Sequence, residues 1–294
     1  MKTSPFRTHL VHKKSQSLNQ FQACGSYFGR PGDTRWNSEY DATVELQKKL
    51  EKSNDNLNTL MQKLNVPKFS KDEIEFCKEY LLVMKPISCA LDYIQGDNTF
   101  LGDILPMVIK IRSEISSEEA NFKFCNPLSN AVLNGLDKRF QHLFQDKHHI
   151  LASLTHPKYK THWIKDQNDK EDHIKLLRAE VAAMTKQKPN EKYNEKDNDV
   201  EKGNDFMYFE DDENSYEVDE VQLYLKCQQR DLMSLKQFPT IEKIFRKYNT
   251  ILPSSAAVER LFSQGKIIFG NKRHKLHDSS AEKQLMLKVN QKFY

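Results

Sequence analysis

Apolar residues recur along the first half of the chain at spacings of three, four and seven positions, the period of amphipathic α-helices. This pattern predicts helices over residues 40–64, 70–86, 87–94, 101–115 and 128–144. Pro67, Pro86 and Gly96 should end the first three of these helices, and Ser70 and Glu73 have the spacing of a capping box. Because strand-like alternation is scarce, we predict a mainly α-helical fold with few strands.

The helical pattern fades after residue 164. Residues 165–220 are rich in Lys, Asn, Asp and Glu, and only 174–184 has a helical pattern, so most of this stretch is predicted to be a disordered linker. Beyond it, helices are expected over residues 240–248, from a cap at Ser255 through Phe262, and after a capping box formed by Ser279 and Glu282. Residues 1–33 are predicted to be a weakly ordered lead-in.

Composition limits the class of protein. Hydrophobic residues make up 38% of the 294 positions, enough to fill the cores of one or two domains. The five cysteines are an odd number without a Cys-x-x-Cys pair, which argues against a disulfide framework or a zinc finger and favours a reducing compartment. No apolar run approaches the roughly 20 residues of a membrane span. We therefore predict an intracellular protein with no membrane segment and no metal site.

The net charge of +4 is unevenly distributed. Residues 191–220 carry thirteen acidic side chains against three lysines, whereas residues 260–292 carry eight basic side chains against two acidic ones. A basic segment can bind a phosphate backbone by releasing counterions, and an acidic segment can shield it. Ordinary solvated surface is the alternative interpretation of both segments.

Four blocks of the sequence carry specific motifs. The most specific is Pro-Ser-Ser-Ala-Ala-Val-Glu-Arg-Leu-Phe-Ser at 253–263, within a block that runs from 238 to 290. Thr-Arg-Trp-Asn-Ser at 34–38 is the second. Shorter similarities cover 91–106, which includes Leu-Gly-Asp, and 151–160, which includes Thr-His-Pro-Lys-Tyr. Together the four blocks resemble the C-terminal part of the hAT family of DNA transposases, and the resemblance identifies the chain as a domesticated hAT transposase-derived protein.

The resemblance implies a domain organisation. In the family, a long helical insertion interrupts an RNase H-like fold, whose closing helices form the hAT C-terminal dimerisation region. Residues 34–164 would then be the helical insertion domain, 165–220 the acidic linker, and 221–294 the dimerisation region. The closing helices would belong to the RNase H-like fold.

The resemblance also identifies a candidate catalytic residue. Transposition of this type needs three carboxylates that hold two divalent metals about 4 Å apart. The third carboxylate of the family falls at Glu259, but only 33 residues precede Thr34, and neither the first two acids nor a zinc-binding BED domain is found there. Glu259 is therefore interpreted as a remnant of the catalytic triad, as a helix residue that forms a surface pair with Arg260 or Lys266, or as a buried partner for a backbone donor. We predict a non-enzymatic protein without cofactors.

Two alternatives remain open. The chain could be a fragment of an active transposase, whose upstream part supplies the other acids and which would use Mg²⁺ for DNA strand cleavage and transfer. It could also be a degenerate gene product without a selected function. The family resemblance favours a nuclear location over a cytoplasmic one.

The predicted interface and DNA-contact residues come mainly from the C-terminal block. The expected partner is a second copy of the chain or a related hAT-type protein, with DNA as a further partner and no small-molecule substrate. The candidate dimer interface is apolar and comprises Val258, Leu261, Phe262, Ile267, Ile268, Phe269, Leu285 and Leu287. The candidate DNA-binding residues are Arg35, Trp36, Lys266, Lys272, Arg273 and Lys275. Trp36 could instead anchor the first helix of the insertion.

Overall fold

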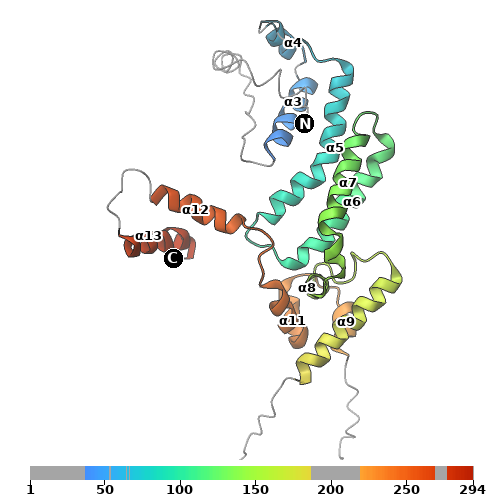
Figure 1. The fold of residues 1–294 in the computed structure, drawn as a ribbon, viewed down its shortest axis with the longest axis vertical. Helices are drawn as coiled ribbons and strands as arrows, with labels where there is room; N and C mark the ends of the chain where they lie inside the picture. Colours follow the sequence, from blue (N-terminus) through green and yellow to red (C-terminus); the bar gives the residue numbers. More distant parts are fainter. Residues whose placement is uncertain are drawn as a thin grey trace, which may run out of the picture. The chain divides into compact units, whose positions relative to one another are not determined.

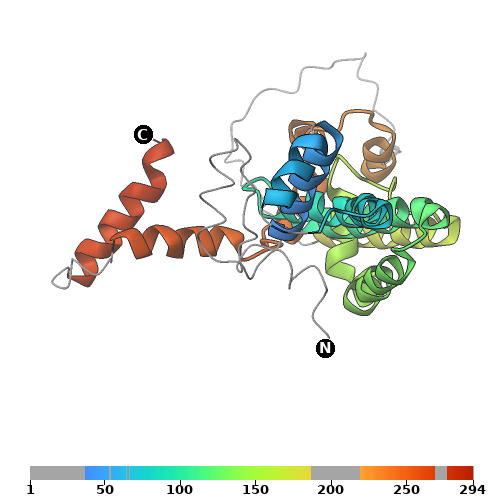
Figure 2. The same ribbon diagram turned by 90° about the horizontal axis from the view of Figure 1, so that it is seen from above.

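The computed structural model describes residues 37–52, 54–63, 65, 67–186, 219–268 and 277–293, and the regular structure within these ranges is helical throughout (Figures 1 and 2). The predicted mainly α-helical fold is confirmed for this part of the chain. The described helices are α3 (Ser38–Lys52), α4 (Asn54–Lys63), α5 (Lys71–Ile94), η1 (Leu101–Asp103), α6 (Ile104–Glu118), η2 (Glu119–Asn121), α7 (Asn126–Phe140), η3 (Gln141–Gln145), α8 (Lys147–Thr155), α9 (Gln167–Lys186), α10 (Glu220–Lys226), η4 (Leu232–Gln237), α11 (Pro239–Asn249), α12 (Ala256–Ile268), α13 (Asp278–Val289) and η5 (Asn290–Phe293).

The helices form two compact units. The first contains the described residues up to Ile94 together with Lys110–Lys138, and the second contains Gln95–Ile109 and the described residues from Arg139 onward. The division falls within α6 and α7, and therefore inside the segment 34–164 that the sequence suggested as one domain. None of the helices in the described ranges is both long and apolar enough to cross a membrane.

In the first unit, α3 and α4 replace the single helix predicted over residues 40–64. Leu50 of α3 and Met61 of α4 are buried in one cluster with Cys77 of α5. In one straight helix these two side chains would lie about 16 Å apart along the axis. Two separate helices let both residues reach the same core, which periodicity alone could not indicate.

Helix α5 confirms one of its predicted ends and not the other. The capping box is present, because the Ser70 N–H donates to Glu73 Oε2 at 2.8 Å and the Glu73 N–H donates to Ser70 Oγ at 3.2 Å. The predicted end at Pro86 is wrong, since α5 continues to Ile94. Pro86 lacks an N–H and costs the helix one hydrogen bond, but it is buried, as is Val83 in the turn before it. Tertiary packing therefore outweighs the local cost.

The carboxylate of Glu79 organises the turn before α7 in the first unit. It accepts the backbone N–H groups of Lys123, Phe124 and Cys125, each at 2.8 Å, and its side chain is only 5% exposed. Burial raises the pKa of Glu79, but these three hydrogen bonds outweigh that effect and lower it. The charge of one buried side chain thus satisfies three backbone donors in the turn that leads into α7.

Helix α8 is the centre of the second unit. Its residues 150–155 are all buried, and it packs against α11, η1 and α9. Asn249 at the end of α11 connects two of these elements: its Nδ2 donates to the Ala152 carbonyl oxygen at 3.1 Å, and its Oδ1 accepts the Gly102 N–H at 2.8 Å. A Cβ on Gly102 would lie 2.4 Å from the Ala152 oxygen. Only glycine fits at this close approach of two backbones.

Helix α9 corrects the predicted start of the linker. The sequence suggested order only over residues 174–184, but α9 extends from Gln167 to Lys186. Leu177 is fully buried, and α9 contacts both α8 and α11. The carboxylate of Glu180 accepts hydrogen bonds from Lys247 and Tyr248 of α11 and pairs with Lys147 of α8. These long-range contacts stabilise a segment whose polar composition resembles a linker. The remainder of the predicted linker, residues 187–218, lies outside the described residues.

Candidate functional site

Helices α12 and α13 pack against each other in the second unit. Gly265 and Ile268 of α12 and Ala281 of α13 are buried. Gly265 has no side chain and Ala281 has only a methyl group, so two helices can approach closely at these positions. The predicted capping box of Ser279 and Glu282 is wrong, since α13 already begins at Asp278 with His277 at the N-cap.

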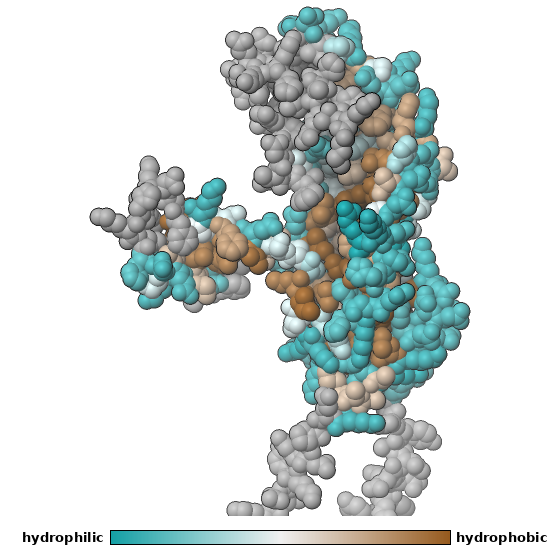
Figure 3. Space-filling model, in the orientation of Figure 1, coloured by the Kyte–Doolittle hydropathy of each residue, from teal (hydrophilic) through white to brown (hydrophobic). Residues whose placement is uncertain are grey.

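Large apolar side chains lie on the outer surface of this helix pair. On α12, Val258 is 44% exposed, Phe262 70% and Ile267 65%, and on α13 Leu287 is 67% exposed. Val258 and Phe262 are four residues apart and therefore adjacent on one face of the helix. Figure 3 shows brown, apolar residues on the segment that contains α12. We call Val258, Phe262, Ile267, Met286, Leu287 and Val289 the α12–α13 apolar surface.

The other predicted interface residues occupy different positions. Leu261 and Leu285 are partly buried, and Ile268 is 6% exposed. Phe269 lies outside the described residues. The residues predicted from the sequence did not include Met286, which is 55% exposed. Its place in the apolar run Leu-Met-Leu could have indicated it. Periodicity identifies the apolar residues of a helix, but it does not separate those that face a partner helix from those that face solvent.

Glu259 lies in the first turn of α12, where the helix dipole favours a carboxylate. Its side chain is exposed, and Oε1 accepts a hydrogen bond from Ser255 Oγ at 2.8 Å. The neighbouring Arg260 pairs with Asp97 at 2.5 Å and donates to the Gln95 carbonyl oxygen at 2.6 Å. The suggested pair between Glu259 and Arg260 is therefore not formed. Across the described residues, no three His, Cys, Asp or Glu side chains are grouped so that they could hold a metal ion.

The predicted DNA-binding residues are only partly described. Lys266 is in the last turn of α12 and is exposed. The remaining candidates lie outside the described residues: Arg35, Trp36, Lys272, Arg273 and Lys275. The basic group that the sequence suggested therefore stays a prediction.

Three of the sequence blocks meet in the core of the second unit. Asp103 of the Leu-Gly-Asp block is fully buried and accepts a hydrogen bond from the Tyr159 hydroxyl at 2.7 Å. His156, from the same block as Tyr159, has its Nε2 3.9 Å from Asp103 Oδ1 and its ring 5.7 Å from that of Phe245 on α11. Asp103 thus forms one polar cluster with residues more than 50 positions further along the chain, inside an apolar core.

The cluster of Asp103, His156 and Tyr159 has a structural role. Burial lowers the pKa of His156 to about 4, although the Asp103 carboxylate acts in the opposite direction. The imidazole is therefore neutral at pH 7, and its Nδ1 accepts the Lys158 N–H at 3.2 Å. A neutral ring that accepts on one nitrogen carries its proton on the other, Nε2, which faces Asp103. The cluster orders the turn after α8.

No protein-family model and no curated protein matches this chain.

Proposed function

We propose that this chain is a hAT transposase-derived protein that acts by associating with a second copy of itself through the α12–α13 apolar surface. The observation that supports the proposal most directly is the exposure of Phe262, which is 70% accessible beside the exposed Val258. Large apolar side chains that lie exposed and adjacent on a helix face often mark a site where a partner binds. Association requires no catalytic carboxylate, so the proposed role is independent of Glu259.

The expected affinity is modest. Full burial of a large apolar side chain contributes about 1.5–3 kcal/mol. The four side chains that are more than half exposed on this surface are Phe262, Ile267, Met286 and Leu287. Because each of them is already partly buried, the four together would contribute about 4–8 kcal/mol per copy, which association costs of a similar order reduce. We therefore expect self-association in the micromolar range, unless residues outside the described ranges add to the contact.

The family assignment belongs to the same proposal. The blocks at 91–106, 151–160 and 238–290 carry it, and they meet around Asp103, His156 and Phe245. We propose that 34–164 corresponds to the helical insertion of a hAT enzyme and that 221–294 corresponds to the closing helices of its RNase H-like fold. A nuclear location and a non-enzymatic role follow from this assignment as further hypotheses.

An accessory contact with DNA is a secondary proposal. Lys266 is exposed at the end of α12, and the sequence places Lys272, Arg273 and Lys275 shortly after it. Phosphate contacts of this kind are independent of DNA sequence and weaken as the salt concentration rises. Replacement of the three later residues by Ala should reduce the salt dependence of DNA binding. If the dependence of DNA affinity on salt concentration does not change, Lys272, Arg273 and Lys275 are excluded as the DNA contact.

The test of self-association is the mass of the full chain in solution. Light scattering at tens of micromolar should give a dimer, and Phe262→Asp should give a monomer, because an unpaired charge is costly in an apolar contact. Met233→Asp is the matched control, since Met233 is 65% exposed but lies in η4. Circular dichroism should show equal helix content in both variants.

Two results would contradict the proposal. A monomer at tens of micromolar for the unaltered chain would exclude a stable dimer. A dimer that survives Phe262→Asp would place the contact elsewhere.

A further inference from the structure

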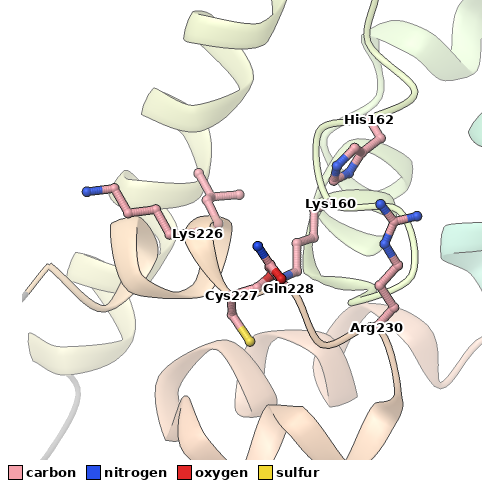
Figure 4. A pocket seen from close by; sticks show the side chains of 7 residues that line it. Lys160, His162, Lys226, Cys227, Gln228 and Arg230 are labelled. Carbon is pink, nitrogen blue, oxygen red and sulfur yellow. The ribbon is translucent and has the colours of Figure 1, made fainter.

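A cavity of about 410 Å³ lies in the second unit, between the loop after α8 and the end of α10 (Figure 4). Four of the residues that line it have basic side chains, and none is acidic. The lining residues are Lys160, His162, Leu225, Lys226, Cys227, Gln228 and Arg230. Such a concentration of basic groups with no carboxylate in the lining distinguishes this cavity from ordinary mixed-charge surface.

Lys160 places a positive charge in one wall. Its side chain is 2% exposed, and Nζ donates to the Tyr224 carbonyl oxygen at 2.8 Å and to the Cys227 carbonyl oxygen. Both carbonyls are at the C-terminal end of α10, where the helix dipole favours a cation. An ammonium group has three N–H donors, and these two bonds account for two of them. The charge of Lys160 is therefore held in place without a neutralising carboxylate.

Arg230 adds a second charge that acts on the first. Burial lowers the pKa of Lys160; Cys227 acts in the opposite direction, and the positive charge of Arg230 adds a smaller lowering effect. Two like charges that repel each other are stabilised when an anion lies between them. Arg230 is exposed, and in Figure 4 its guanidinium points toward His162. The five N–H donors of a guanidinium suit the oxygens of phosphate.

His162 and Gln228 complete the polar lining. His162 Nδ1 is 2.9 Å from the Tyr159 carbonyl oxygen. Because a carbonyl only accepts, Nδ1 must carry the proton, which leaves Nε2 as the nitrogen available to another group. The amide of Gln228 can donate two hydrogen bonds. Lys226 points away from the other labelled side chains in Figure 4, so it contributes through its charge rather than by contact.

We propose that this cavity binds the phosphate group of a small molecule, either inorganic phosphate or a phosphate monoester, with Arg230 as the principal contact. The volume exceeds that of a phosphate ion, and pockets for small molecules commonly measure about 300–1,000 Å³. The esterified group of a monoester therefore has room beside the phosphate. The proposal does not depend on self-association through the α12–α13 apolar surface, because it uses other elements of the same unit.

The test is a titration of the full chain with inorganic phosphate at constant ionic strength. The NMR signals of the backbone amides monitor the titration. Signals from 160–162 and 226–230 should shift and saturate. Arg230→Gln should weaken binding about tenfold or more, as expected for a lost charge-assisted hydrogen bond. Arg139→Gln is the matched control because Arg139 is also exposed but does not line the cavity, and its affinity should stay within about twofold.

Titrations with two other ligands identify the kind of phosphate compound that binds. If a mononucleotide with a 5′-phosphate binds more tightly than inorganic phosphate, the ligand is a phosphate monoester. If it binds more weakly, the ligand is the free phosphate ion. Shifts that do not saturate, or an Arg139→Gln variant as impaired as Arg230→Gln, would overturn the proposal. Equal binding of a 5′-hydroxyl oligonucleotide, which has only phosphodiesters, would also overturn it in favour of a nucleic-acid backbone. The amide spectrum of each variant shows directly that it is folded.

Discussion

The buried carboxylate of Glu180 allows a quantitative test of the second unit. Glu180 Oε1 accepts hydrogen bonds from Lys247 Nζ and the Tyr248 hydroxyl, each at 2.8 Å, and Oε2 lies 2.7 Å from Lys147 Nζ. The side chain is 6% exposed, whereas both lysine side chains are about half exposed. In Glu180→Gln the lysines can regain water, but the charge that attracts them is lost. The variant should therefore destabilise the protein.

The size of this destabilisation follows from the pKa of Glu180. Burial raises this pKa, but the hydrogen bonds from Lys147, Lys247 and Tyr248 outweigh burial and lower it from the ordinary value of 4.5 to about 2. A difference of about 2.5 pKa units corresponds to roughly 3 kcal/mol of stability. Because the pKa is lower in the folded state, this stability is fully present above pH 4.5 and is lost as the pH falls toward 2. About half should remain near pH 3.2.

Urea unfolding at a series of pH values measures this contribution. At pH 7, Glu180→Gln should lower the free energy of unfolding by about 3 kcal/mol relative to the unaltered chain, and the difference should shrink below pH 4.5. Glu242→Gln is the matched control, because Glu242 forms an i,i+4 pair with Arg246 on the surface of α11. Such pairs contribute about 0.3–0.5 kcal/mol.

Two outcomes would refute the reasoning. Equal destabilisation by Glu180→Gln and Glu242→Gln would show that the buried carboxylate contributes no more than a surface pair. A difference between Glu180→Gln and the unaltered chain that stays constant between pH 7 and pH 3.2 would show that the ionised state of Glu180 is not its source.

Three further predictions concern other buried groups. Gly102→Ala should lower the free energy of unfolding by about 2 kcal/mol or more in urea, because its Cβ would lie 2.4 Å from the Ala152 oxygen; unchanged stability would contradict this close approach. Glu79→Gln should cost about 1–3 kcal/mol by thermal unfolding, since an amide cannot accept three N–H groups as a carboxylate does. That loss should vanish in acid, because the lowered pKa of Glu79 stabilises the fold only above the unfolded value. Burial raises the pKa of Cys77 to about 11, so mass spectrometry should show alkylation of the exposed Cys89 but not of Cys77 at pH 8; equal labelling would contradict the packing of Cys77.

The sequence by itself determined the mainly helical class and the position of several helix ends. Apolar spacing identified α11, and the Ser70–Glu73 capping box set the start of α5. Both signals act over a few residues, so they can be recognised without knowledge of the fold. The same reasoning found the apolar residues of α12, including Val258 and Phe262, which form the candidate association surface.

The tertiary structure decided features that depend on distant residues. The continuation of α5 through Pro86 and the full length of α9 result from burial against other elements. The cavity beside Lys160 joins segments more than sixty positions apart, through hydrogen bonds to the end of α10. Likewise, only packing separated the buried Ile268 from the exposed Ile267. Local sequence specifies which side chains are apolar or charged, but the neighbours that bury or pair them are chosen when the chain folds.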